Sequence, residues 1–177
     1  MKRCEWASTN ETLQYYHDTE WGIPSHDDRY LFEILCLEGF QSGLSWLTVL
    51  NKRPAFKKAF ANFEVKKIVK FTPSQKTSLM KNGDIIRNRL KIGAVINNAE
   101  AVLEIRKEFG SFSDYVWSFT GGKTANRNAE EIAGFLSKDL KKRGLKFVGP
   151  GNTYSFMQAV GMVNGHAANC AFKKIKY

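Results

Sequence analysis

The chain has 177 residues, of which 43% are hydrophobic, so it can form a packed core without a framework of disulfides. Three cysteines are an odd and sparse set, which excludes a disulfide-rich secreted domain and indicates thiols used as ligands or core residues. The net charge of +10 points to a polyanionic partner, although a basic face that only keeps the protein soluble would give the same total.

The positive charge lies almost entirely after residue 38. Residues 1–38 carry eight acidic and three basic side chains, whereas the remainder carries nine acidic and twenty-four basic ones. No Asp or Glu follows Asp139, yet seven Lys or Arg side chains do. This asymmetry favours a nucleic acid as the partner.

The apolar residues are too dispersed for a membrane protein. Residues 1–6 lead into a polar stretch rather than into the apolar core of a signal sequence. No apolar run approaches the roughly 20 residues that a membrane helix needs. We therefore expect a cytoplasmic monomer that does not associate with membranes.

Capping residues and apolar spacing predict a helix that begins shortly after residue 25. Ser25 and Asp28 form a candidate capping box before this helix. Leu31, Leu35 and Glu38 then fall on one face at helical spacing. Because two of these residues are apolar, the face and its carboxylate should point inward.

Two further helices are expected in the first half of the chain. Ser45 is a candidate N-cap for a helix that starts at Trp46, and Pro54 should end it because proline breaks a helix interior. Another helix is expected from Thr72, a cap that is followed by proline, to Asn82, which is followed by glycine.

The longest predicted helix runs from about residue 88 to residue 108. Gly110 follows it, and glycine is the residue type that most often ends a helix. Helical spacing places seven apolar residues on one stripe, namely Ile92, Val95, Ile96, Ala99, Val102, Leu103 and Phe109.

Two more helices are expected near the C-terminus. One spans residues 129–143 and stops at Gly144, and the other spans residues 153–162, after the Gly-Pro-Gly turn at residues 149–151. Alternating strand patterns are scarce, and residues 145–148 are too few to build a sheet.

The predicted fold class is therefore all-α. We expect one domain over residues 1–177, made of two packed helical subdomains. In this arrangement the N- and C-terminal segments lie together, and residues of roughly 50–130 form the middle.

Four residues near the chain ends form a candidate metal site. Cys4 and His17 lie near the start, and His166 and Cys170 are four positions apart near the end, so a helical turn would place these last two on one face. Two thiolates and two imidazoles are an ordinary tetrahedral set for a structural zinc, which would tie the termini together. A surface histidine or a buried free cysteine is the commoner explanation of each residue alone, so spacing leaves both interpretations open.

Residues 6–46 combine aromatic side chains with one carboxylate that should point inward. The set consists of Trp6, Tyr15, Tyr16, Trp21, Glu38 and Trp46. A buried carboxylate among aromatic faces suits a flat, cationic ligand that offers N–H donors. The alternative is a core of tryptophans and a helix-end Glu that reaches solvent. The turn at residues 41–44 contains Gly43 between a polar and an apolar residue, a tip of the kind that enters a base stack.

Six segments resemble a known family. They are residues 3–6, 16–24, 37–46, 140–149, 154–161 and 163–170, in order along nearly the whole chain. The string Leu37-Glu-Gly-x-Gln-x-Gly-Leu-Ser-Trp46 is the most specific of them. Together they resemble the bacterial 3-methyladenine DNA glycosylase I family. The resemblance implies a helix-hairpin-helix DNA glycosylase fold with its termini joined by a structural zinc site.

The resemblance also implies roles for individual residues. The implied zinc ligands are Cys4, His17, His166 and Cys170. The implied base pocket is formed by Trp6, Trp21, Glu38 and Trp46, and the implied catalytic residues are Glu38, Tyr16 and Trp46. The implied DNA contacts come from Gln41, Gly43 and Leu44 in the turn and from Gly149, Gly151 and Thr153 in the hairpin. Backbone N–H groups of this hairpin would hold a phosphate.

Three features depart from the family pattern. The hairpin reads Gly-Pro-Gly-Asn-Thr over residues 149–153, where the last three places usually hold bulkier apolar residues. Gly165 replaces the usual Asp before His166, and the stretch at residues 121–132 looks short. None of these changes touches an implied zinc ligand or the base pocket.

The chain lacks the equipment of a glycosylase with lyase activity. No lysine occupies the hairpin turn, so a Schiff-base mechanism is not expected. No carboxylate follows the hairpin either, where many relatives of this fold carry an Asp that supports glycosidic cleavage. A purine methylated at N3 is already cationic and leaves as a neutral base, so strong activation of water is not required.

We therefore expect a monofunctional DNA glycosylase of base excision repair. It should flip 3-methyladenine, and as a second candidate 3-methylguanine, out of double-stranded DNA containing alkylated purines and hydrolyse the N-glycosidic bond. The alternative is a zinc-stabilised DNA-binding protein without glycosylase activity.

Overall fold

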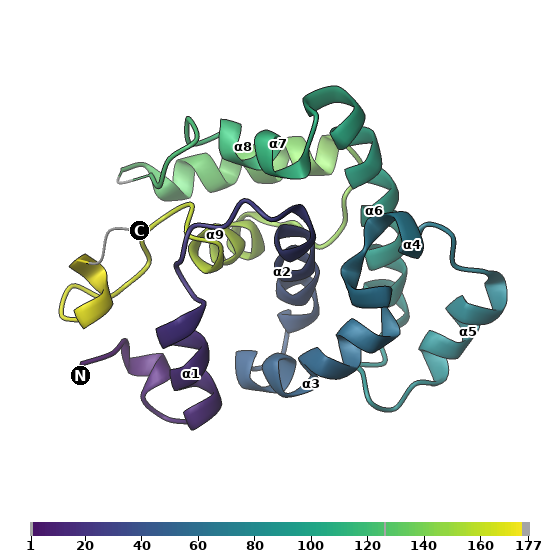
Figure 1. Ribbon diagram of the computed structural model, residues 1–177, viewed down its shortest axis with the longest axis horizontal. Coiled ribbons are helices and arrows are strands. Elements are labelled where there is room, and N and C mark those ends of the chain that lie inside the picture. The colour runs from purple at the N-terminus through teal and green to yellow at the C-terminus, as the bar shows by residue number, and fades with distance from the viewer. Residues whose placement is uncertain (1, 126, 175–177) are drawn as a thin grey trace.

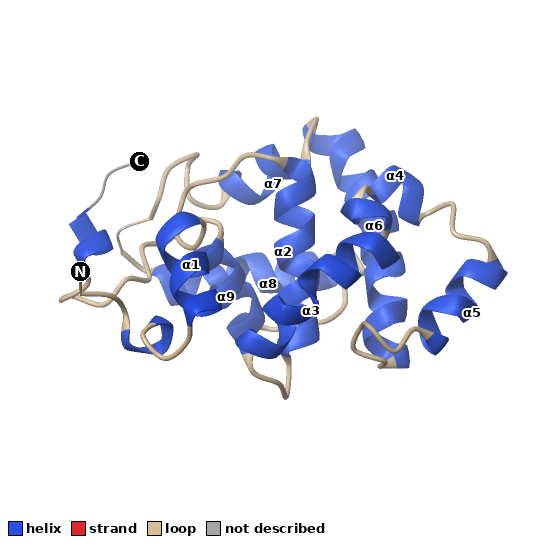
Figure 2. Cartoon of the chain, turned by 60° about the horizontal axis from the view of Figure 1, so that its bottom comes forward, coloured by secondary structure: helices blue, strands red, loops and turns tan. Residues whose placement is uncertain are grey.

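The computed structural model describes residues 2–125 and 127–174, and helices make up its regular structure (Figures 1 and 2). The α-helices are α1 (Glu11–Thr19), α2 (Asp28–Gln41), α3 (Trp46–Ala59), α4 (Val65–Ile68), α5 (Pro73–Lys81), α6 (Arg89–Phe109), α7 (Phe112–Ser118), α8 (Ala129–Lys142) and α9 (Pro150–Ala159). The short 3₁₀ helices are η1 (Glu5–Ala7), η2 (Ala61–Phe63) and η3 (Ala171–Lys174). These described ranges contain no strand, so the predicted all-α class is confirmed.

Helix α2 lies at the centre of the molecule. It packs against α3, α6, α7 and α9, and every residue from 31 to 40 is buried. A helix that is buried on all sides is stable only in the interior of a protein. Its burial carries two carboxylates, Glu33 and Glu38, into the core.

The two ends of the chain lie together. The Ala171 N–H donates to the carbonyl oxygen of Lys2 at 2.9 Å, which ties η3 to the segment before η1. Helices α8 and α9 pack on each other, and α9 packs on α2. In Figure 1, α4 and α5 lie on the side away from the termini. The predicted division into two subdomains, with residues of roughly 50–130 in the middle, stays a prediction.

The predicted capping box of α2 is wrong. The N-cap is Asp27, whose side chain accepts the N–H of Tyr30. Asp28 instead accepts the N–H groups of Phe112 and Ser113 at the start of α7 and pairs with Arg106. This carboxylate is thus used between helices, which a local pattern does not reveal.

Helix α3 begins as predicted but does not end at Pro54. Its N-cap Ser45 accepts the N–H of Thr48, and the helix continues through Pro54 to Ala59. Buried residues on both sides of the proline, Val49 and Phe56 among them, hold the segment against the core. Packing therefore overrides the cost of a proline in the helix interior.

Several other helix ends are confirmed. Thr72 forms a complete capping box with Gln75 at the start of α5, and Asn88 caps α6. Gly110 ends α6 with φ +90°, a backbone conformation that favours glycine. Helix α8 ends within one residue of its predicted end. None of the helices in the described residues has both the length and the apolar character needed to cross a membrane.

Helix α9 begins and ends three residues earlier than predicted. Gly149 is its N-cap and Pro150 its first residue, because the fixed φ of proline suits the start of a helix. The predicted turn at residues 149–151 is therefore already the first turn of the helix. Helices α1, α4 and α7 were not predicted, since each lacks a long apolar stripe.

Candidate active site and metal centre

Four buried side chains from the two ends of the chain converge on one point. The ligand atoms of Cys4, His17, His166 and Cys170 all lie within 4.8 Å of one another. The Cys170 Sγ lies 3.5 Å from His17 Nε2 and 3.6 Å from His166 Nδ1, and the Cys4 Sγ lies 3.8 Å from His166 Nδ1. Both cysteines are free, so no disulfide competes for their sulfur atoms.

The backbone brings these residues together in a way that differs partly from expectation. His17 is in the last turn of α1, and Cys4 directly precedes η1. His166 and Cys170 do not share a helix, so the predicted helical turn is wrong. The N–H of Cys170 donates to the carbonyl of Ala167, and this non-helical turn brings both side chains to the same point.

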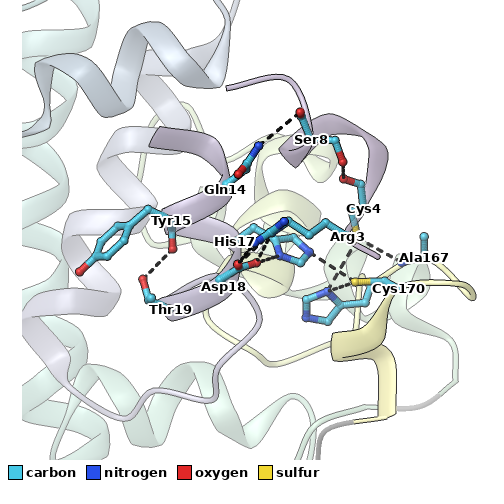
Figure 3. Close-up of polar contacts among 11 residues, drawn as sticks. Arg3, Cys4, Ser8, Gln14, Tyr15, His17, Asp18, Thr19, Ala167 and Cys170 are labelled. Carbon is cyan, nitrogen blue, oxygen red and sulfur yellow. Dashed lines mark hydrogen bonds and ion pairs between the residues drawn. The ribbon is translucent and has the colours of Figure 1, made fainter. Parts of the chain in front are cut away.

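Neighbouring groups orient the cluster (Figure 3). His17 Nδ1 lies 2.9 Å from Asp18 Oδ1, and Arg3 in turn pairs with Asp18 at 2.7 Å. The Ala167 N–H donates to the Cys4 Sγ at 3.3 Å. A carboxylate on the far nitrogen of a histidine and an N–H on a sulfur atom are typical surroundings of metal ligands.

The donor set fits a zinc ion. Two sulfur and two nitrogen donors fill four tetrahedral positions and leave none open for a substrate. Burial lowers the pKa of His166 to about 4, so its ring stays neutral and keeps a lone pair available. The group could therefore hold a metal with a structural role.

A cavity of about 280 Å³ opens beside this cluster. It is lined by Trp6, Tyr16, Trp21, Glu38, Gln41, Trp46, Ser155 and Gln158. Ring centroids lie 5.1 Å apart for Trp6 and Trp21 and 5.5 Å apart for Tyr16 and Trp46, so the walls are aromatic. All five residues named for the pocket or for catalysis line this cavity, and Gln41 joins them.

Three other residues refine the picture of the cavity. Ser155 and Gln158 were missed by sequence reasoning, because the packing of α9 on α2 leaves no local signal. Tyr15 was grouped with the aromatic cluster, but it is 72% exposed and lies outside this cavity.

A larger hollow of about 400 Å³ lies between α3 and α5 and has no buried carboxylate in its lining. Chemistry, rather than size, therefore identifies the site.

Glu38 lies in this cavity without a protein partner. Only 6% of its surface is exposed, and within the described residues its carboxylate makes no hydrogen bond or ion pair. Glu33, five residues earlier on α2, contrasts with it, because Arg53 donates to it at 2.6 Å. Burial raises the pKa of Glu38 to about 8, because the charged carboxylate is costly in the empty pocket. A cation or an N–H donor in the pocket would stabilise this charged form.

The hydroxyl of Tyr16 is a second unsatisfied group. Its oxygen is fully buried and has no partner in the described part of the chain. Burial also raises the pKa of Tyr16, so the hydroxyl keeps its proton and can donate. Together with Glu38 it offers a donor and an acceptor to a flat ligand.

The Cys/His cluster supports the pocket wall. The Trp21 ring stacks on His17, with centroids 5.8 Å apart, and meets His166 edge-on at 4.7 Å. Trp6 meets His17 edge-on at 5.4 Å. Gly22, with φ +81°, passes so close that a Cβ would lie 2.9 Å from His166 Nε2. Two walls of the pocket therefore rest on the two histidines.

The turn after α2, residues 41–45, is exposed beside the pocket, and we name it the wedge loop. Gly43 has φ +82°, which permits the tight turn, and the N–H of Leu44 donates to the carbonyl of Gln41. Leu44 is 42% exposed although it is apolar. An exposed apolar tip next to an aromatic cavity suits insertion between bases.

The comparisons with known proteins agree with this geometry. The family model described as methyladenine glycosylase matches residues 6–174. The chain belongs to this family. A DNA-3-methyladenine glycosylase of Haemophilus influenzae is 42% identical over 97% of both chains, and DNA-3-methyladenine glycosylase 1 of Escherichia coli is 42% identical over 96% of both. A structure of the Y16F variant of a 3-methyladenine DNA glycosylase I, solved in complex with 3-methyladenine, is 36% identical, with a TM-score of 0.92 over 100% of both chains.

Gly165, where the family usually has Asp, adjoins a residue of the pocket lining. A Cβ at this position would lie 2.5 Å from the Nε2 of Gln158, which lines the pocket. Its φ is outside the left-handed region, so space rather than backbone conformation favours glycine here. The side chain of Gln158 fills the place that a larger residue would take.

The three residues predicted to contact DNA from the hairpin differ in exposure. Gly151 is exposed in the first turn of α9, where helix N–H groups have no internal partner. Thr153 is fully buried, its N–H donates to Gly149 and its hydroxyl donates to Val148. The predicted contacts of Gly149, Gly151 and Thr153 with DNA stay predictions, and the hydroxyl of Thr153 is already bonded inside the protein.

Proposed function

We propose that this protein is a monofunctional DNA glycosylase of base excision repair that removes 3-methyladenine from double-stranded DNA. The observation that carries the proposal is Glu38, a buried carboxylate without a partner in an aromatic cavity. The membership in the methyladenine glycosylase family supports it independently. We also propose 3-methylguanine as a second, weaker substrate.

The pocket favours a cationic purine over a normal one. The faces of Trp46 and Tyr16 attract a positively charged ring, and Glu38 accepts N–H donors of the base. A base that carries positive charge or N–H groups also removes the cost of ionising Glu38 in the empty pocket. Normal adenine offers no such charge, so it gains less from the same walls.

The chemistry then requires little from the protein. The N-glycosidic bond of an N3-methylated purine is weak because the base leaves as a neutral molecule. Glu38 and Tyr16 hold the base outside the stack, and the cavity excludes most water from it. No Asp or Glu side chain lies beyond Asp139, so α9 adds no second carboxylate.

We propose that Cys4, His17, His166 and Cys170 hold a structural zinc. When bound, the ion would join the two termini and would fix the histidines that carry Trp6 and Trp21. The support is the set of two sulfur and two nitrogen donors and their burial. The residues of the pocket carry out base binding.

We further propose that Gln41 and Leu44 enter the duplex while the first turn of α9 holds a phosphate in a helix-hairpin-helix manner. The exposure of Leu44 and of Gly151 supports this arrangement. The monomeric state and the cytoplasmic location remain predictions from the sequence.

The experiment is to incubate the purified protein with methylated duplex DNA and to separate the released bases by chromatography. We expect free 3-methyladenine, a smaller amount of 3-methylguanine and no normal base. If a folded, metal-loaded protein binds the duplex but releases no base, the protein is a zinc-stabilised DNA-binding protein without glycosylase activity.

A further inference from the structure

Lys91, a buried lysine of α6, hydrogen-bonds to the backbone at the base of the wedge loop. The Lys91 ammonium donates to the carbonyl oxygens of Phe40 at 2.8 Å and of Ser42 at 2.6 Å. Only 8% of Lys91 is exposed. These carbonyls lie at the end of α2, where a helix leaves its last carbonyl groups without internal partners and favours a cation. The base of the wedge loop is thus fixed to α6.

Helix α6 also holds the connection between α8 and α9, residues 143–149, which leads into the hairpin. Asn98 donates from Nδ2 to the carbonyl of Lys146 at 2.9 Å, and its Oδ1 accepts the N–H of Lys146 at 2.8 Å. Asn97 donates to the carbonyl of Gly144 at 2.7 Å. Because Asn98 is 3% exposed, these bonds are shielded from water. The hairpin is therefore fixed to α6 one and a half to two turns from Lys91.

A direct contact joins the two loops. The Asn152 amide donates to the Ser42 hydroxyl at 3.2 Å and to the carbonyl of Phe147 at 3.0 Å. A Cβ at Gly39 would lie 3.2 Å from the Cβ of Phe147, so the end of α2 and the hairpin touch. Three polar links thus connect the wedge loop, the hairpin and α6.

We propose that Lys91 and Asn98 are positioning residues that set the distance between the wedge loop and the hairpin. The inference rests on the proposed function, because it concerns how a duplex bound at the hairpin meets the tip that enters the stack. Neither residue lines the base pocket, so both act on DNA and not on the free base. A displacement of about 1 Å in such machinery is enough for roughly a 100-fold loss of rate.

The decisive variant is Lys91→Met, which keeps an unbranched side chain of similar length and removes the donors. We expect single-turnover excision of 3-methyladenine from duplex DNA to fall about 10- to 100-fold. The affinity for free 3-methyladenine, measured by quenching of tryptophan fluorescence, should change less than about twofold, since the pocket is untouched. Lys91→Arg should recover most of the rate because it can still donate to both carbonyls. Lys107→Met, an exposed lysine on the same helix, is the matched control and should behave as wild type.

A second substrate separates positioning from stability. A lesion opposite a mismatched base costs less to flip, so the loss caused by Lys91→Met should shrink there. A loss that is equal on both substrates, or an equal loss of free-base affinity, would overturn the inference, and so would full activity of the variant. If Lys91→Met does not fold, Asn152→Ala is tested in its place. We expect slower excision from duplex DNA with unchanged affinity for the free base. An excision rate equal to that of wild type would overturn the inference. Absence of release by wild type would instead overturn the proposed function.

Discussion

The Cys/His cluster and the base pocket share a wall, yet most of their buried polar groups are arranged differently. In the cluster, His17 is held by Asp18 and the sulfur of Cys4 accepts a backbone N–H, although the Nε2 of His166 has no partner within the described residues. In the pocket, Glu38 and the hydroxyl of Tyr16 have no partner within the described residues. A satisfied buried group holds structure in place, whereas an unsatisfied one costs free energy that a ligand recovers. The difference separates a region built for stability from one built for binding.

Removing the proposed zinc should have the largest effect, because it would open the cluster and loosen the pocket wall together. Chelation or Cys170→Ser should lower the free energy of unfolding by about 2–5 kcal/mol, the range for losing a covalent cross-link in a small domain. Thermal unfolding with metal analysis measures this. Cys36→Ala, which changes a buried cysteine outside the cluster, should keep the metal content unchanged. An equal unfolding temperature with and without chelator would remove the stabilising role.

Changing Glu38 should lower activity without lowering stability. Glu38→Gln keeps the shape and removes the charge, so excision of 3-methyladenine should fall about 10²- to 10³-fold, as when an electrostatic contact to the transition state is lost. Glu33→Gln on the same helix is the contrasting control. It breaks a buried pair with Arg53 and should lower stability by about 3–5 kcal/mol. Full excision by Glu38→Gln would refute the role of this carboxylate.

The raised pKa of Glu38 predicts a pH dependence of stability with a definite sign. A carboxyl that ionises at about 8 in the folded protein and near 4.5 when unfolded binds more protons when folded. Stability is therefore lost as the pH rises from about 4.5 to 8, and the loss is complete above 8. Glu38→Gln should remove this cost and be more stable than wild type at pH 9 by about 1–3 kcal/mol, with little difference at pH 5. Denaturant titrations at both pH values test this, and a difference that does not change with pH would show that the carboxylate is already satisfied.

Chemistry and spacing predicted the site better than they predicted its surroundings. Glu38 follows from helical spacing, because an apolar face of α2 carries it inward. The four proposed ligands follow from their residue types at the two chain ends and from the family resemblance. These signals are local or chemical, so they survive without knowledge of how the helices pack.

The features that were wrong or missed depend on contacts between distant segments. Asp28 was assigned to its own helix but caps α7, and Pro54 continues α3 because the core holds both sides of it. Ser155 and Gln158 entered the pocket unpredicted, since they depend on α9 packing on α2. The hydrophobic periodicity of the sequence does not reveal which distant segments pack together.

The smallest effect, and the sharpest test of the contrast, concerns the hydroxyl of Tyr16. Tyr16→Phe removes an unsatisfied buried group, so stability should stay within about 1 kcal/mol of wild type or rise. Affinity for free 3-methyladenine should fall about 2- to 10-fold, because one hydrogen bond to the base is lost. Tyr15→Phe is the matched control, since this neighbour is exposed and should change neither quantity. If Tyr16→Phe instead lowered stability and left base affinity intact, the hydroxyl would be bonded inside the protein, and the pocket would be organised like the cluster beside it.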